Sequence, residues 1–341
     1  MALSELWFIL VGVLFIGFFF LEGFDFGVGM STQFLAKDET ERRVLIRTIG
    51  PVWDANEVWL ITAGGAMFAA FPHWYGSVFR GYYMAFVLLL LALIVRGVSF
   101  EFREKGDTQK WRYTWDLALF TGSILPPFLF GVFFTSLVQG LPLGEGMHVN
   151  ANFFGDIVNV TSVIGGILFV LLSYLHGLFF IGLKTEDDIR ARAFGQAKKT
   201  FIATLVVLIA YAAMFLTSDS GIMAGGNAPF TYVIIAAIVT LLLAFPFMMK
   251  QREGWAFIMT GLTFILITAS YFVGLFPNVL VSSIDPIYNL SIHDAASGDY
   301  SLKLMTYVAA TMVPIVLAYT AWTYYIFRQR ITRKKVEQAE H

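Results

Sequence analysis

The sequence predicts an all-α integral membrane protein. Of its 341 residues, 57% are hydrophobic and only 14% are charged, and the mean hydropathy is +0.71. Apolar stretches of about 20 residues, the length of a bilayer-spanning helix, recur along the whole chain. This composition excludes a soluble globular domain. The absence of cysteine from the sequence excludes iron–sulfur clusters, thiolate metal sites and disulfides within this chain.

Nine stretches are predicted to cross the membrane. The first follows an N-terminal segment without positive charge and stays apolar past residue 21, so we expect a retained span rather than a cleaved signal peptide. No linker or low-complexity segment interrupts the sequence, so residues 1–341 are expected to form a single membrane domain. The nine spans are centred near residues 18, 63, 88, 125, 171, 209, 239, 265 and 316.

The distribution of Lys and Arg predicts the orientation of the spans. Successive loops alternate in charge, and 21 of the 23 basic residues fall in one set of loops, whereas only Arg80 and Lys303 fall in the other. Basic loops of membrane proteins stay preferentially in the cytoplasm. We therefore expect the N-terminus outside and the C-terminus in the cytoplasm, which requires an odd number of spans.

A weak internal repeat is compatible with a duplicated fold. The sequence FLEGFDFG at residues 20–27 is similar to YLHGLFFIG at residues 174–182, with Glu22 aligned to His176. Apolar helices also match by chance, so duplication and coincidence both stay open. A real repeat would divide the chain into two four-helix bundles and one peripheral helix, at residues 1–140, 155–275 and 303–328.

Four acidic residues lie inside predicted spans, where a charged group costs a few kcal/mol or more. Glu22 and Asp25 are three residues apart in the first span, and Asp54 and Glu57 repeat this spacing in the second, at residues 50–72. The spacing puts each pair on one face of its helix. Because no Lys or Arg lies deep in any predicted span, the acids are expected to be protonated or to meet a partner from another chain.

Both acidic pairs are expected in the cytoplasmic half of the membrane, because the first span enters from outside and the second starts from the cytoplasm. Four acids in one layer indicate either a proton-uptake route or a polar seam against a partner subunit. For Asp54 a simpler interpretation is also open, since an acid is favoured in the first turn of any helix.

Two tryptophans flank the second acidic pair, and two arginines end the third predicted span. Trp53 and Trp59 either hold the environment of the acids or lie in the interfacial aromatic belt, which is the ordinary place for tryptophan. Arg96 and Arg103, in the sequence RGVSFEFREK, end the third span. We favour both arginines as snorkelling anchors at the membrane surface, with pairing of Arg96 to one of the acids as the alternative.

Histidine positions limit the cofactors that this chain can bind. His176 is the only histidine within a predicted span. Bis-histidine haem ligation needs two imidazoles at one depth, and a single intramembrane histidine is more often hydrogen-bonded structure than an iron ligand. The sequence contains no nucleotide-binding loop, no HExxH motif and no metal-ligand cluster. Its net charge of −1 gives no reason to expect a nucleic acid partner.

Four segments form a specific pattern that runs through the chain in order. They are GFFFLEGFDFGVG at residues 17–29, GPVWDANEVWLITAGGAMFAAFP at residues 50–72, RGVSFEFR at residues 96–103 and the stretch 289–325. Together they resemble subunit II of cytochrome bd-type quinol oxidases. The second segment is the longest and most specific of these matches.

This resemblance implies a complex that oxidises quinol and reduces dioxygen to water in a bacterial or archaeal cell membrane. Haem b and haem d are then expected in the partner, subunit I, and this chain is expected to ligate no metal. The resemblance to subunit II implies that this chain is a scaffold of two four-helix bundles plus a peripheral helix. It also implies that this chain contributes to the cytoplasmic proton route. A structurally bound quinone, membrane lipid and a small single-helix accessory subunit are further partners that the resemblance implies.

In the family motif PVWDxNEVW, the aspartate assigned to the proton route corresponds to Asp54. The predicted site has no catalytic centre of its own and consists of a proton-transfer set, Asp54, Glu57, Glu22 and Asp25, with Trp53, Trp59 and Arg96 in support. Two other classes of protein would also carry intramembrane acids. A proton-coupled secondary transporter would need broken helices and a site at the membrane midplane, and a purely structural scaffold would use the acids for assembly alone.

Overall fold

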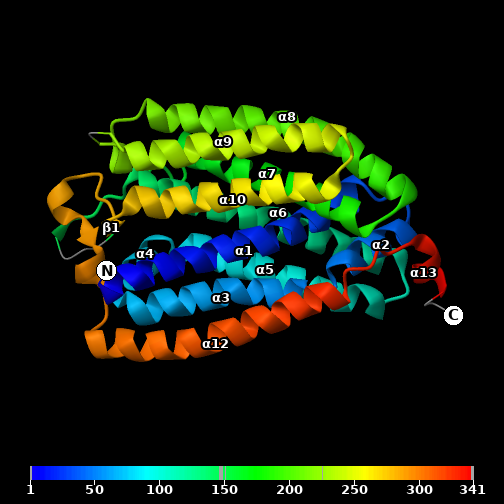
Figure 1. The fold of residues 1–341 in the computed structure, drawn as a ribbon, viewed down its shortest axis with the longest axis horizontal. Helices are drawn as coiled ribbons and strands as arrows, with labels where there is room; N and C mark the ends of the chain where they lie inside the picture. The colour runs from blue at the N-terminus through cyan, green and yellow to red at the C-terminus, as the bar shows by residue number, and fades with distance from the viewer. Residues whose placement is uncertain (1, 146–148, 150, 225, 339–341) are drawn as a thin grey trace.

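The structure is a bundle of long helices that run side by side (Figure 1). It is a computed structural model that describes residues 2–145, 149, 151–224 and 226–338. The α-helices are α1 (Leu3–Phe34), α2 (Glu39–Ile49), α3 (Trp53–Ala70), α4 (Pro72–Gly81), α5 (Tyr83–Phe102), α6 (Gln109–Gln139), α7 (Val160–Lys184), α8 (Asp187–Leu216), α9 (Ala228–Met249), α10 (Glu253–Leu275), α11 (Ile292–Ala295), α12 (Asp299–Ile326) and α13 (Arg333–Gln338). Short 3-10 helices are η1 (Arg103–Lys105), η3 (Gly221–Met223) and η4 (Pro286–Tyr288), and the two strands are β1 (Asn278–Leu280) and β2 (Leu290–Ser291).

Eight helices of the described chain are long and apolar enough to cross a membrane: α1, α5, α6, α7, α8, α9, α10 and α12. They coincide with eight of the nine predicted spans. The remaining predicted span, at residues 50–72, contains α3, an 18-residue helix that packs along α1. The first turns of α3 carry Asp54, Asn56 and Glu57, and these polar residues lower its hydropathy below that of the eight.

Helix α1 lies at the centre of the bundle. It contacts α3, α6, α7 and α10, whereas α8 and α9 lie at one edge and α12 lies at the other (Figure 1). Phenylalanine side chains of α1, among them Phe18 and Phe26, are fully buried in this core. Helix α12 is attached differently, because Leu302 is its one buried residue in the described chain. The fold therefore has a densely packed centre and a loosely attached last span.

Glycines let α1 and α7 cross in direct backbone contact. A Cβ atom on Gly27 of α1 would lie 2.1 Å from the carbonyl oxygen of Ser173, and one on Gly177 of α7 would lie 2.5 Å from the Cα of Gly27. These distances leave no room for any side chain, and small residues serve close helix packing in membranes generally. The crossing ties the helices that follow residue 160 to the first helix of the chain.

The basic loops gather at one end of the bundle, termed the basic end, where α2 and α13 lie (Figure 1). Many of their arginines pair with acids from other loops. Arg103 is only 1% exposed and pairs with Asp116 at 2.6 Å and with Glu39 at 2.8 Å. The expectation that Arg103 is a snorkelling anchor is therefore wrong, because its guanidinium is buried between acids of the same chain.

The chain beyond α12 folds back over the basic end. Val336 of α13 is fully buried there, next to the α2 region that α13 contacts. Three ion pairs hold the tail in place: Arg330 to Glu253 at 2.6 Å, Arg333 to Asp38 at 2.9 Å and Arg333 to Glu41 at 3.3 Å.

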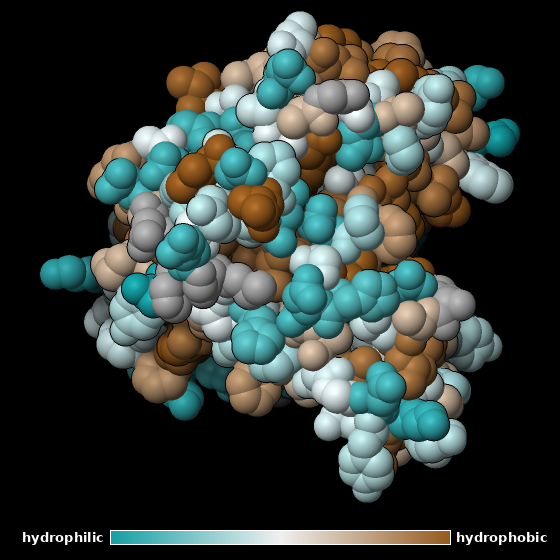
Figure 2. Space-filling model, turned by 90° about the vertical axis from the view of Figure 1, so that its left-hand side faces the viewer, coloured by the Kyte–Doolittle hydropathy of each residue, from teal (hydrophilic) through white to brown (hydrophobic). Residues whose placement is uncertain are grey.

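The opposite end carries a cap made of α4, α11 and the β1–β2 pair, near the N-terminus (Figure 1). The two strands are antiparallel, with Asn278 opposite Ser291 and Leu280 opposite Leu290. Figure 2 looks onto this end and shows polar side chains spread over it, with apolar side chains gathered at its upper margin. The cap covers the helix ends that lie farthest from the basic end.

Candidate functional site

Five polar side chains from four helices meet inside the bundle and form the buried acid cluster: Glu22 and Asp25 of α1, Asn56 of α3, Arg96 of α5 and Tyr324 of α12. Glu22, Asp25, Asn56 and Arg96 are each 0% exposed, and Tyr324 is half-buried. Buried polar groups of this kind are tolerated when they pair or form hydrogen bonds with one another. The packing of these four helices brings them into contact.

Glu22 and Arg96 form an ion pair in which the Arg96 guanidinium donates to Oε1 of Glu22. The guanidinium also lies over two aromatic rings, 4.8 Å from the centre of Phe26 and 5.6 Å from that of Phe100. The favoured role of Arg96 as a snorkelling anchor is wrong, and so is the expectation that no basic residue reaches the acids. The long side chain of Arg96 turns inward from α5, and the pairing that was the alternative is confirmed.

Asp25 is bound by a different set of groups. The Asn56 side-chain amide donates a hydrogen bond to Oδ2 of Asp25 at 2.6 Å, and the Tyr324 hydroxyl donates to Oδ1 of Asn56 at 2.8 Å. Sequence reasoning missed both Asn56 and Tyr324. Asn56 carried a usable signal, since it is a polar residue inside a predicted span, but nothing local to Tyr324 distinguishes it from the other tyrosines of the chain.

The cluster is not fully neutralised by its own groups. One guanidinium, that of Arg96, faces the two buried carboxyls of Glu22 and Asp25, and the same guanidinium also acts on the half-buried Glu57. Oε2 of Glu22 and Oδ1 of Asp25 are buried without a hydrogen-bond partner among the residues that the structure describes. The cluster must therefore hold an additional proton or carry net negative charge, and it has free oxygen atoms with which to bind that proton.

Asp54 lies apart from the cluster. Its side chain is exposed in the first turn of α3, whereas Asn56, two residues later, faces α1. The four predicted acids thus do not occupy equivalent positions: Asp54 is exposed, Glu57 is half-buried, and Glu22 and Asp25 are buried. The exposed position of Asp54 is compatible both with the simple helix-terminus interpretation and with contact to a partner or to water.

The two tryptophans hold α3 against its neighbours. Trp53 stacks on Phe100 of α5 with 4.6 Å between ring centres. Trp59 covers Gly17 of α1 so closely that a Cβ atom on Gly17 would lie 2.3 Å from the indole ring. Both tryptophans are thus packing residues beside the acids, and Trp59 in particular is anchored to the middle of α1 rather than to an aromatic belt.

His176 is hydrogen-bonded on both sides of its ring. Nδ1 lies 2.8 Å from Oγ1 of Thr260, Nε2 lies 3.3 Å from the carbonyl oxygen of Phe20, and the ring stacks on Phe257 at 4.2 Å. Both ring nitrogens are engaged in these hydrogen bonds, so this arrangement of His176 does not fit a haem ligand. Within residues 2–145, 149, 151–224 and 226–338, no group of three or more His, Cys, Asp or Glu side chains could hold a metal ion.

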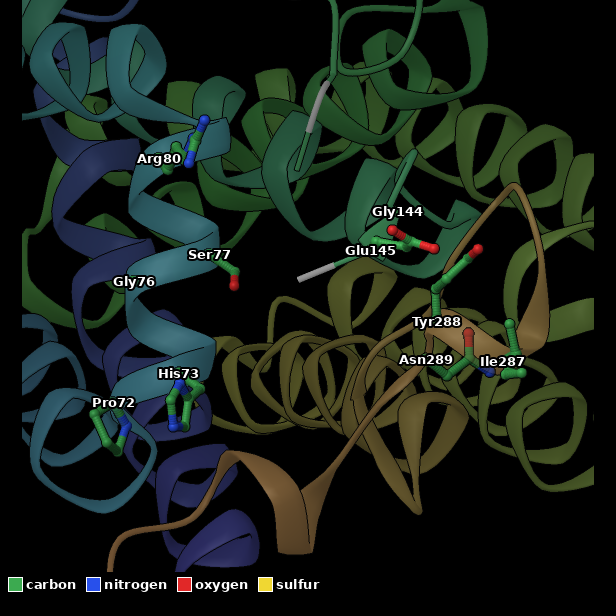
Figure 3. Close-up of a pocket in the computed structure, with 10 residues that line it drawn as sticks. All are labelled: Pro72, His73, Gly76, Ser77, Arg80, Gly144, Glu145, Ile287, Tyr288 and Asn289. Carbon is green, nitrogen blue, oxygen red and sulfur yellow. The ribbon is translucent and has the colours of Figure 1, made fainter. Parts of the chain in front are cut away.

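Two cavities open on the molecule. A lateral cavity of about 580 Å³ borders the acid cluster at Tyr324 and is otherwise lined mainly by apolar side chains of α1, α7, α10 and α12. A second cavity of about 670 Å³ lies at the capped end, where His73, Ser77 and Arg80 of α4 face Glu145 and Tyr288 (Figure 3). Of these two cavities, the lateral one borders the buried acid cluster.

Fold and site together define a polytopic membrane protein that carries a buried, incompletely neutralised acid cluster. The chain belongs to the family of subunit II of the cytochrome bd terminal oxidase, whose family model matches residues 3–327. It is therefore a subunit of a bd-type oxidase of the respiratory chain, and the family predicted from the sequence is confirmed.

Relatives match over nearly the full chain. The sequence is 48% identical over 334 residues to the cytochrome bd ubiquinol oxidase subunit 2 of Bacillus subtilis strain 168, with 98% of each chain covered. It is 35% identical over 372 residues to the cytochrome bd-I ubiquinol oxidase subunit 2 of Escherichia coli strain K12, with 100% of this chain and 98% of the other covered. Among solved structures, the bd oxidase from Geobacillus thermodenitrificans matches the fold with a TM-score of 0.74 at 16% identity, covering 96% of this chain and 99% of that chain.

The buried ion pair makes a prediction about stability. Replacing Arg96 alone, in Arg96→Met, should destabilise the protein by about 3–5 kcal/mol, because Glu22 is left buried without its cation. The double variant Glu22→Gln with Arg96→Met should recover much of this loss. As a control, Arg330→Gln removes a pair whose arginine is 38% exposed and should cost about 1 kcal/mol or less. The thermal midpoint of the purified complex measures all three, and an Arg96→Met midpoint equal to that of Arg330→Gln would contradict the prediction.

Proposed function

We propose that this chain holds the haem-bearing subunit I of a quinol oxidase and carries part of the route by which cytoplasmic protons reach the site of dioxygen reduction. Quinol supplies the electrons, and the formation of water from dioxygen consumes protons. The observation that carries this proposal is the buried acid cluster, in which the single guanidinium of Arg96 faces the carboxyls of Glu22 and Asp25. A cluster with this charge balance can bind an additional proton inside the membrane.

The proposed topology has nine spans, with α3 as the second. The N-terminus lies outside and the C-terminus in the cytoplasm of a bacterial or archaeal cell, so the basic end is cytoplasmic. Helices α1, α3, α5 and α6 make up the first four-helix bundle, α7 to α10 make up the second, and α12 is the peripheral helix. The packing of α3 along α1 and the exposure of α12 support this arrangement.

The proposed proton route runs from Asp54 toward the buried acids. Asp54 accepts a proton at the basic end, and Glu57 follows one helical turn later, about 4.5 Å along α3. Glu57 and the Glu22–Asp25 pair then share the field of Arg96. The increasing burial from Asp54 to Glu57 to Asp25 supports this order.

The haems are proposed to lie in subunit I. The haem groups would supply the electron transfer and dioxygen reduction of the complex, and the hydrogen-bonded His176 supports a chain that does not ligate them. Subunit I and this chain form the heterodimeric core of the proposed complex, to which a small single-helix subunit can add.

The lateral cavity is the best candidate site in this chain for the structural quinone. Its volume of about 580 Å³ and its lining of aromatic side chains, including Phe20, Phe24 and Phe257, suit an isoprenoid chain. A transporter function is less well supported, because each of the eight long apolar helices is continuous and transporter sites are typically built at broken helices.

The proton role predicts a kinetic defect for Asp54→Asn. This substitution should slow quinol oxidation by the assembled oxidase about tenfold or more, because an amide cannot relay a proton, while the haem content stays unchanged. The measurement is oxygen consumption with excess quinol, normalised to haem. Asp107→Asn, an exposed acid at the same end but outside the predicted spans, is the matched control and should leave turnover unchanged.

Two results would decide against this role. Full turnover of an Asp54→Asn oxidase with all haems would leave Asp54 as a helix-terminus residue. Equal slowing by Asp107→Asn would indicate a general effect of removing charge at the basic end.

The haem assignment predicts that His176→Ala leaves every haem absorption band in place. The substitution removes a hydrogen bond to Thr260 and leaves a small void, so only a modest loss of stability is expected. A reduced-minus-oxidised spectrum of the assembled variant, at matched protein concentration, tests this. Selective loss of one band would show that this chain supplies an axial ligand.

The topology predicts opposite locations for two reporters. A reporter fused to the C-terminus should be active in the cytoplasm, and one inserted in the loop 138–159 should be active outside. Finding both reporters on the same side would contradict the proposed topology, because five spans, α7 to α10 and α12, separate the two positions.

A further inference from the structure

The peripheral helix α12 reaches the buried acids through one side chain. Its Tyr324 hydroxyl donates to Oδ1 of Asn56 at 2.8 Å, and Nδ2 of Asn56 donates to Oδ2 of Asp25 at 2.6 Å. The three residues belong to α12, α3 and α1, and the two bonds form a continuous chain from the half-buried Tyr324 to the fully buried Asp25.

Tyr324 and Asp25 together favour one orientation of the Asn56 amide. An amide carries an oxygen that accepts and an NH₂ group that donates, and the two ends exchange places when it flips. The Tyr324 hydroxyl, acting as donor, keeps the amide oxygen on its own side. Nδ2 is then directed at Asp25, whereas a flipped amide would turn its oxygen toward the Asp25 carboxyl, where no hydrogen bond can form unless that carboxyl is protonated.

Tyr324 brings α12 into contact with the polar interior near the basic end, where Lys184 also donates to the carbonyl oxygen of Phe327. Leu302 is the one buried residue of α12 in the described chain, and it lies at the capped end, where Trp7 donates to its carbonyl oxygen at 3.2 Å and to Oγ1 of Thr306 at 3.0 Å. Toward the basic end, Tyr324 lies between the lateral cavity and Asn56. Tyr324 thus connects the docking of the last span to the acid cluster.

We propose that Tyr324 is a positioning residue for Asp25: acting through Asn56, it holds the amide donor on the carboxyl and thereby keeps Asp25 in the arrangement that exchanges protons. This inference rests on the proton role proposed above for the acid cluster. The charged groups that face Asp25 are Glu22 of its own helix, Arg96 of α5 and Glu57 of α3, whereas the Tyr324 hydroxyl donates its hydrogen bond to Asn56.

The test uses the complete oxidase. Tyr324→Phe removes the hydroxyl and should lower kcat for quinol oxidation about three- to tenfold, with the KM for quinol and the haem content unchanged, since one hydrogen bond is lost. Tyr325→Phe is the matched control, because it removes a hydroxyl from the exposed neighbouring tyrosine, and kcat should not change. In an Asn56→Ala background, Tyr324→Phe should have no further effect, because the residue through which it acts is already absent.

Asn56→Asp is an independent second variant. Its carboxylate can still accept from Tyr324 but cannot donate to Asp25, so it should lower kcat at least as much as Tyr324→Phe. It also keeps the proposal testable where Tyr324→Phe fails to assemble.

The outcomes separate this inference from the proton role itself. If Asp25→Asn slows the oxidase while Tyr324→Phe and Asn56→Asp do not, the positioning role is wrong and the proton role stands. If Asp25→Asn also turns over at the normal rate, the proton role of the cluster is wrong and the positioning role falls with it. Equal effects of Tyr324→Phe with and without Asn56 would overturn the proposal, because Tyr324 would then act by another path.

Discussion

The ion pair between Glu22 and Arg96 is the interaction on which the polar interior depends. Both side chains are fully buried, and the guanidinium is bounded by the rings of Phe26 and Phe100, so each charge relies on the other for compensation. The pair fixes α5 to α1 and commits the one buried cation of the cluster to Glu22. Asp25 is left with the neutral donor Asn56, and this arrangement is the basis of the proton role proposed above.

Away from the basic end, the fully buried ions of the described chain come from α1 and α5. The polar contacts that α7, α8 and α10 make there, such as His176 with Thr260 and Tyr211 with Tyr271, are neutral. The glycine crossing of α1 and α7 is made by backbone atoms and involves no charged side chain. The two parts of the interior therefore differ in chemistry, one apolar and tightly packed, the other charged and the place of the proton role proposed above.

Hydropathy was sufficient to predict the eight long apolar helices, because an apolar run of about 20 residues is a long and redundant signal. The partners within the site depend instead on contacts between distant residues. Arg96 turns toward a carboxyl 74 positions away, and Tyr324 bonds to a residue 268 positions away, so neither contact leaves a local pattern. The exposure of Asp54 could not be predicted from the sequence either. The face of α3 that packs on α1 carries Asn56 and not Asp54.

The segment that follows α12 also determines at which stage of synthesis the ion pairs of the basic end can all form. Arg333 pairs with Glu41 and Asp38, which precede it by 292 and 295 positions. A ribosome makes these acids first, and every span must be synthesised before their last partner exists. Glu41 meanwhile has Arg192 as a partner, at 2.6 Å. The helices can thus assemble as they emerge, but the ion pairs of the basic end are complete only after Arg333 has left the ribosome.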